Sequence, residues 1–434
     1  MGRGQSGWYS SHRVKRRLLI GLALLTAAFV IAWAVASVDR CGSWTMQPPS
    51  LTHIARGQGN LQIGAAKAEL KISFPTTAGG YGPRRSTVDR ALSPLFARAL
   101  VLDVGGQRLG LVLLDVLLIP PQLRDAIAQG QPFPTWVLAT HTHSGPSGFD
   151  PRFASELAAL GTFARADLDA ISSAGRQALT DASASIKPAH LEVGEALSEG
   201  VSLARSGTEV DRRITRLRFD GVDGPVAQVV IASAHPTLVP RRPDGLHPDW
   251  PGLLAEKLEQ EKGPITFVLQ GAGGNASVDR TKLATPEAAA ARFAELVRGV
   301  PTTAQPETID AAWSEVHVQL PRPDARLVVP FVFKAAAENA LCDDAEDFAV
   351  LHSLRLGDVR LLFVPFEPSF AAGQVLEEQA QATRLVSLAD GYAGYLETVA
   401  AARSGEGEAR RQYFGPELLT AIVEGARLAS QGIR

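Results

Sequence analysis

Six short apolar runs recur along the chain, each bounded by polar residues or glycine. They are rich in Val, Ile and Leu, and their length and spacing predict buried strands. Patterns with a helical period lie between them, so we expect an α/β fold. Residues 185–223 predict extended, hairpin-like structure, which makes the expected sheet mixed. The predicted strands are residues 97–104, 109–114, 136–139, 228–232, 265–269 and 360–364, and the predicted helices are residues 166–183, 252–260, 286–297 and 368–381.

The N-terminal segment predicts one transmembrane helix. Residues 18–38 form an apolar run that is uncharged up to Val38 and long enough to cross a bilayer as a helix of about 20 residues. The basic residues within 1–17 should stay in the cytoplasm, so the remainder should face the periplasm or the extracellular side. A cleaved signal peptide is the alternative, because Ala34-Val35-Ala36 resembles a cleavage site, and the protein would then be secreted. The length of the run favours a retained anchor.

Composition limits the rest of the chain. Hydrophobic residues make up 45% and charged residues 20% of the 434 residues, which is typical of globular proteins. A formal net charge of -2 gives no reason to expect a nucleic-acid partner, and no protein partner is predicted. Residues 39–60 are rich in Ser, Pro and Gly and predict a linker, and residues 61–434 predict one large domain. The two cysteines, Cys41 and Cys342, allow either one disulfide or two free thiols.

The strongest chemical motif is Thr140-His141-Thr142-His143-Ser144-Gly145-Pro146. It follows the predicted strand at residues 136–139. In a strand, residues i and i+2 point to the same face, so His141 and His143 should lie together. Two such imidazoles either share a metal, divide metal binding and proton transfer between them, or form a structural pair.

Four further motifs also follow predicted strands or turns. His235 precedes Pro236 after an apolar run, and it is either a ligand or a packing residue. The loop from Gln270 to Ser277 could present an oxyanion cradle and a serine, or it is a plain turn. Glu367 is either a metal ligand or a helix-start glutamate. Tyr392 and Tyr395 either line a pocket or pack in the core.

The order of these motifs resembles the catalytic domain of the neutral/alkaline non-lysosomal ceramidases. The resemblance covers about residues 61–420, and its most specific part is the His-Thr-His-Ser-Gly-Pro run. Family members typically continue into an immunoglobulin-like C-terminal domain, which we do not expect here. The other matching pieces are Gly80-Tyr81-Gly82, Leu114-Asp115, Ala204-Arg205-Ser206, His235-Pro236-Thr237, Asp249-Trp250-Pro251-Gly252, Gly274 to Ser277, Pro365-Phe366-Glu367-Pro368, Tyr392 to Tyr395 and Tyr413-Phe414-Gly415-Pro416.

The resemblance implies a role for each matching residue. A Zn2+ cofactor would be held by His141, His235, Glu367 and Tyr395. The implied catalytic residues are Ser277 as a nucleophile, His143 beside the metal and Arg205 in contact with substrate. The expected substrate-binding residues are Tyr81, Gly274, Asn275 and Tyr392.

The resemblance implies a zinc-dependent hydrolase of an amide bond, with N-acylsphingosine (ceramide) or a related lipid amide as the partner. The sequence departs from the family at Gly274-Asn275-Ala276-Ser277, where members usually have Gly-Asp-Val-Ser. Two alternatives therefore stay open. One is a zinc hydrolase of a different N-acyl amide or ester, and the other is a catalytically inactive, membrane-tethered binding protein.

Overall fold

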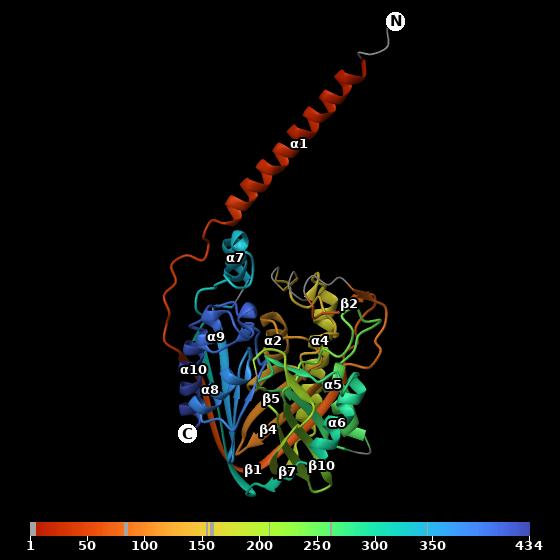
Figure 1. The fold of residues 1–434 in the computed structure, drawn as a ribbon. Coiled ribbons are helices and arrows are strands. Elements are labelled where there is room, and N and C mark those ends of the chain that lie inside the picture. The colour runs from red at the N-terminus through yellow and green to blue at the C-terminus, as the bar shows by residue number, and fades with distance from the viewer. Residues whose placement is uncertain are drawn as a thin grey trace.

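A 13-stranded mixed sheet organises the fold of the computed structural model (Figure 1). The structure describes residues 6–81, 86–152, 155–156, 160–207, 209–260, 263–344 and 346–434. Gly82 of the motif above lies outside these residues. The strands of the sheet are β1 (Ser50–Glu69), β4 (Phe96–Val104), β5 (Gln107–Leu114), β6 (Thr135–Ala139), β7 (Lys187–Leu197), β9 (Arg213–Gly221), β10 (Gly224–Ala232), β11 (Ile265–Gln270), β13 (Thr303–Ala304), β14 (Thr308–Gln319), β15 (Phe348–Leu356), β16 (Val359–Phe363) and β18 (Arg384–Val386).

All six predicted strands are confirmed, as β4, β5, β6, β10, β11 and β16. The sheet is mixed as expected: the pairs β5–β6, β10–β11 and β16–β18 are parallel, and the other pairings are antiparallel. Three two-stranded ladders lie outside it: β2 (Thr76–Thr77) with β3 (Thr87–Val88), β8 (Ser202–Ala204) with β12 (Ala276–Val278), and β17 (Glu367–Pro368) with β19 (Tyr395–Leu396).

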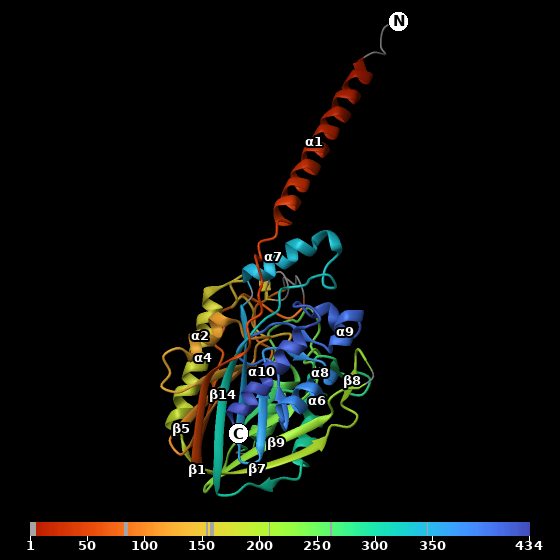
Figure 2. The same cartoon turned by 90° about the vertical axis from the view of Figure 1, so that its left-hand side faces the viewer.

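Helices cover the outer faces of the sheet (Figures 1 and 2). The four predicted helices are confirmed as α4 (Arg165–Ala184), α5 (Asp249–Glu259), α6 (Pro286–Arg298) and α8 (Phe370–Ala380). One face of most strands packs into a shared central core, and the opposite faces pack against helices. Further helical segments are α2 (Pro121–Ala128), η3 (Phe331–Phe333), α7 (Lys334–Asp344), α9 (Val399–Ser404), η4 (Ala409–Arg411) and α10 (Leu418–Gly432).

The expected linker at residues 39–60 is wrong over its last part, because β1 begins at Ser50. The first half of β1 pairs with β14 and its second half with β4. Gly57 lies within the expected linker, but a Cβ atom there would lie 2.0 Å from the carbonyl oxygen of Val104. The glycine therefore permits close strand contact, and its presence does not mark a flexible segment.

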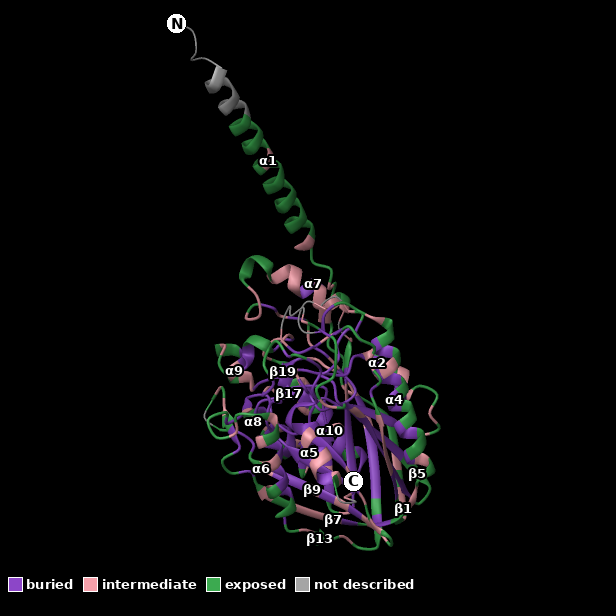
Figure 3. Ribbon diagram, turned by 90° about the vertical axis from the view of Figure 1, so that its right-hand side faces the viewer, coloured by how far each residue is buried: buried purple, intermediate pink, exposed green. Residues whose placement is uncertain are grey.

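Helix α1 (Ser6–Ala36) extends away from the rest of the fold, and its part from Val14 onward is largely exposed (Figure 3). Its segment Val14–Ala36 is long and apolar enough to cross a membrane, by length and composition. Helix α7 lies next to its C-terminal end (Figures 1 and 2). The cysteines form a disulfide between Cys41 and Cys342, which decides between the two alternatives left by the sequence.

Candidate metal centre

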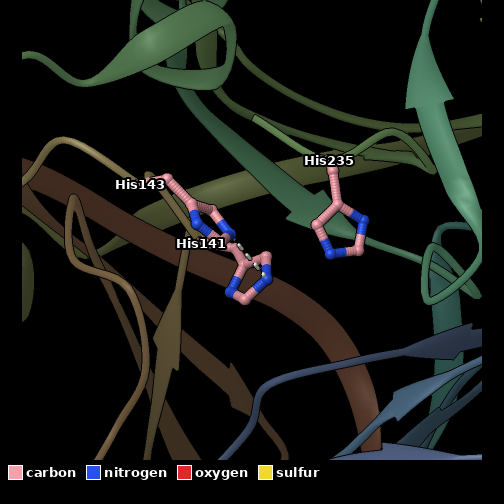
Figure 4. Close-up of side chains that lie close together, drawn as sticks. All are labelled: His141, His143 and His235. Atoms are coloured by element: carbon pink, nitrogen blue, oxygen red, sulfur yellow. Dashed lines mark hydrogen bonds between the residues drawn. The ribbon is translucent and has the colours of Figure 1, made fainter. Parts of the chain in front are cut away.

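Three histidines meet where strands of the sheet end (Figure 4). His141 and His143 follow β6, and His235 follows β10. One ring nitrogen of each histidine lies within 4.8 Å of the corresponding nitrogens of the others. His141 and His235 are buried, and His143 is partly buried. Three imidazoles gathered in this way are a candidate metal site.

The strand argument for the His141–His143 pair is wrong in its detail. β6 ends at Ala139, and His141 has a φ of 69°, in the left-handed region. A non-glycine residue there is strained, and such strain is concentrated at functional sites. The turn still brings the two rings together, with centroids 4.8 Å apart in an edge-to-face arrangement.

Backbone carbonyls determine which ring nitrogen of each histidine carries the proton. The Nδ1 atom of His141 lies 2.8 Å from the Leu117 carbonyl, that of His143 2.6 Å from the Gly80 carbonyl, and that of His235 2.9 Å from the Gly273 carbonyl. A carbonyl can only accept, so each Nδ1 must donate. Each neutral ring therefore presents the lone pair of its Nε2 to the centre, as in metal-binding histidines.

Glu367 and Tyr395 enter the same cluster through the short parallel ladder of β17 and β19, in which these two residues are paired. Glu367 Oε2 lies 3.1 Å from His141 Nε2 and 2.9 Å from His235 Nε2. The Tyr395 hydroxyl lies 2.9 Å from His235 Nε2. The four residues predicted as ligands therefore converge from distant parts of the chain.

This donor set fits a divalent cation. Acceptor atoms face one another at hydrogen-bond distance: the Nε2 atoms of His141 and His143 are 3.4 Å apart, and Glu367 presents a buried carboxylate to two of the rings. Neutral rings with Nδ1 protonated leave no hydrogen between these atoms. A cation would remove the repulsion between them, and two imidazoles with a carboxylate are a common catalytic set for zinc.

The electrostatic environment favours the metal-binding protonation states. Burial, followed by the nearby His141 and His235, lowers the pKa of His143 well below its ordinary value. Burial and Arg205 lower the pKa of His235 to about 4. Burial alone would raise the pKa of Glu367, but His141 and His235 outweigh it and hold that pKa well below its ordinary value. His143 and His235 are thus neutral and Glu367 is ionised at neutral pH.

Three of the residues expected to bind substrate surround this cluster. The Tyr392 hydroxyl donates to Glu367 Oε1 at 2.6 Å, and its ring lines the cavity described below. The ring of Tyr81 lies 4.9 Å from that of His143. Gly274 lies against the backbone of Glu367, because a Cβ atom there would be 2.5 Å from the Glu367 carbonyl oxygen. Any larger residue would push against the backbone of Glu367 and Pro368.

Arg205 contacts the centre through Tyr395. Its guanidinium group donates to the Tyr395 hydroxyl at 2.7 Å and to the Gly274 carbonyl at 2.6 Å, and it pairs with Glu408 at 3.1 Å. Burial and Glu367 raise the pKa of Tyr395 well above its ordinary value, although Arg205 opposes this. In this arrangement Arg205 positions the tyrosine oxygen.

Ser277 and Asn275 lie one layer further out. Ser277 lies in β12 and forms a backbone bridge with His235, but it is not among the residues that line the cavity. The Asn275 amide donates to the carbonyls of Ser206 and Glu209, and its oxygen accepts from the Phe370 amide. Asn275 therefore ties three loops together behind the centre.

An apolar cavity of about 500 Å³ begins at the cluster. Its polar end is formed by His141, His143, Glu367, Tyr392 and Tyr395. From there it runs to the inner side of α7. A volume of this size suits a small organic ligand. The apolar part of the wall consists mainly of Leu117, Leu118, Leu160, Leu320, Val328, Val329, Ala337, Ala340, Leu341, Phe348 and Phe414.

Sequence reasoning missed Glu408, which binds Arg205, and it gave no role to Tyr413, although this residue lies in one of the matching pieces. Tyr413 lines the cavity, and burial and Glu367 raise its pKa to about 12. Glu408 lies in an Ala- and Arg-rich segment with no motif. The carbonyl groups of Leu117 and Gly273 carry no side-chain signal at all.

Together the fold and the centre define a class of protein: a mixed α/β protein with a buried His, Glu and Tyr cluster at its strand ends, beside an apolar cavity. No protein-family model and no curated protein matches the sequence.

Solved structures of ceramidases share the fold. The chain is similar to the neutral ceramidase from Pseudomonas aeruginosa, with a TM-score of 0.72 and 17% identity, over 86% of this chain and 75% of that chain. A ceramidase structure described as complexed with C2 is similar with the same TM-score, at 16% identity and over the same shares. The ceramidase resemblance noted in the sequence is thus confirmed at the level of the fold.

Proposed function

We propose that this protein is a zinc-dependent hydrolase of a lipid amide, with ceramide as the leading candidate substrate. One observation carries the proposal: the converging His, Glu and Tyr side chains form the polar end of an apolar cavity. Lipid amides combine a polar scissile bond with an apolar chain. The bond matches the polar end of the cavity, and the chain matches its apolar part. The ceramidase fold supports the same conclusion.

His141, His235, Glu367 and Tyr395 would hold the zinc ion. When bound, zinc polarises a carbonyl oxygen and lowers the pKa of water. His143 is the proton carrier in this proposal, because its unprotonated Nε2 faces the centre while its Nδ1 donates to Gly80. It accepts a proton from the attacking water and gives it to the departing amine nitrogen as the C–N bond breaks. The products are a fatty acid and an amine.

Dialysis against a chelator tests the proposal directly. We expect the purified protein to contain about one zinc ion per chain and to hydrolyse an N-acylsphingosine in detergent micelles. Chelation should abolish hydrolysis, and added zinc should restore it. A panel of other N-acyl amides and esters, run in parallel, identifies the preferred substrate. A protein with no bound metal and no hydrolysis of any substrate in the panel would instead be a binding protein.

Replacing Ser277 with alanine separates two possible attacking groups. Because Ser277 does not line the cavity, we propose that water attacks and expect kcat to fall by less than about tenfold, far less than the loss of a nucleophile. Steady-state kinetics on the variant make the measurement. A fall to background, with zinc content unchanged, would identify the Ser277 hydroxyl as the nucleophile.

A further inference from the structure

Three exposed apolar side chains project from η3 beside the end of α1. Phe331 is 89% exposed, and Val332 and Phe333 are each 46% exposed. They are consecutive, so they form one patch, and we refer to these three residues as the apolar tip. On the surface of a soluble protein, an exposed apolar cluster of this kind marks an interaction site.

The apolar tip lies at the level of the last turns of α1. The Trp33 indole nitrogen donates to the Val332 carbonyl at 2.5 Å. Trp33 belongs to the segment Val14–Ala36 that is able to span a membrane, and tryptophan at the end of such a helix typically lies at the interface with water. If α1 spans a bilayer, η3 must therefore lie at the bilayer surface.

The attachment to α1 is built from several contacts. The Asn339 side chain of α7 donates to the carbonyls of Ala36 and Val38 at 2.8 and 2.6 Å. Arg40 pairs with Asp343 at 2.8 Å, and the disulfide joins Cys41 to Cys342. These contacts fix α7 to the chain segment that leaves the membrane helix. The position of the apolar tip next to α1 is therefore a built feature of the fold.

The same segment forms the far wall of the cavity. Val328 and Val329, just before the apolar tip, and Ala337 and Leu341 of α7 all line it. Part of the segment thus lines the apolar space beside the metal centre, and the exposed apolar tip belongs to the same segment. This is the arrangement needed to pass an acyl chain from a lipid layer to a buried site.

We propose that the apolar tip inserts into the bilayer surface and that residues 328–341 form an entry port for the acyl chain of a membrane-embedded substrate. The proposal rests on the proposed lipid amidase function for its substrate. The apolar tip contacts the lipid of the same bilayer that contains α1.

The kinetic test uses the full-length protein in phosphatidylcholine nanodiscs. The double variant F331S/F333S is compared with V222S, because Val222 is 93% exposed and lies in the turn between β9 and β10, at the end of the fold opposite α1 (Figure 1). We expect F331S/F333S to lower kcat/KM about tenfold for a long-chain N-acyl lipid in the disc. Hydrolysis of a water-soluble short-chain N-acyl analogue should stay within about twofold, and V222S should match the wild type on both. An equal fall in kcat/KM on both substrates, or no fall on either, would contradict the proposed entry port.

A second measurement does not depend on hydrolysis. An environment-sensitive fluorophore is attached to F331C, with V222C as the matched control, since the two native cysteines are joined. Lipids carrying a nitroxide quencher should quench the label at position 331 and leave the label at 222 unaffected. Quenching of position 331 by aqueous iodide alone would refute insertion, and shielding from both quenchers would indicate a contact between two copies of the chain. If the wild type hydrolyses neither substrate, the proposed function fails, and the label still tests the membrane contact.

Discussion

Replacing Glu367 with glutamine is expected to release the zinc ion and bring hydrolysis to background. The variant keeps the size of the side chain but removes the negative charge that faces His141 and His235. If four ligands share a zinc-binding free energy of about 10–16 kcal/mol, losing one costs about 3 kcal/mol, or roughly a hundredfold in Kd. Metal analysis after gel filtration and the hydrolysis assay together make the measurement.

Glu346 supplies the matched control. It lines the same cavity, but its carboxylate pairs with Arg124 at 2.9 Å, away from the histidines. Glu346→Gln should keep zinc and lose little activity. Circular dichroism on both variants checks that they fold. Retention of stoichiometric zinc by Glu367→Gln would contradict its assignment as a ligand.

Replacing His143 with alanine should give the opposite pattern, with zinc retained and activity lost. Loss of a positioned proton carrier typically lowers rates by about 10²–10⁴-fold. Because burial lowers the pKa of His143, its ring stays neutral until the pH falls well below 6.5. Wild-type kcat/KM should therefore hold through neutral pH and decline only in acid, and this decline should change in the variant.

Added imidazole supplies the control for this variant, because it can replace the missing ring without altering the metal ligands. Partial recovery of kcat by imidazole supports a proton-transfer role. Loss of zinc from His143→Ala would instead make His143 a ligand, as the three-histidine grouping also allows.

Much of the fold was predictable from the sequence because buried strands carry continuous apolar runs. β4, β5, β10 and β11 stand out for this reason. The first half of β1 does not, since its side chains are largely exposed and only its backbone pairing makes it a strand. Local composition cannot report a partner that lies far away in the chain, which is why residues 50–60 resemble a linker in sequence.

Some residues of the candidate centre were likewise predictable from the sequence, and others were not. His141, His235 and Glu367 were predictable because each closely follows a strand or an apolar run, where α/β sheets place their sites. The hydrogen bonds to the Gly80 and Leu117 carbonyls were not predictable. Every residue has a carbonyl group, and only the folded chain determines which one a histidine contacts. Likewise, Glu408 acts on the centre only through Arg205.

The divided pairing of β1 also has a consequence for how the chain acquires its structure. Asn60 faces Thr308, 248 residues later, so half of β1 has no partner until most of the polypeptide is present. Pairings between such distant segments slow folding, because the long loop must be closed before its contacts form. During synthesis this edge stays open, and an open strand edge is prone to aggregate. The protein should therefore depend on chaperones that hold the unfinished chain until β14 arrives.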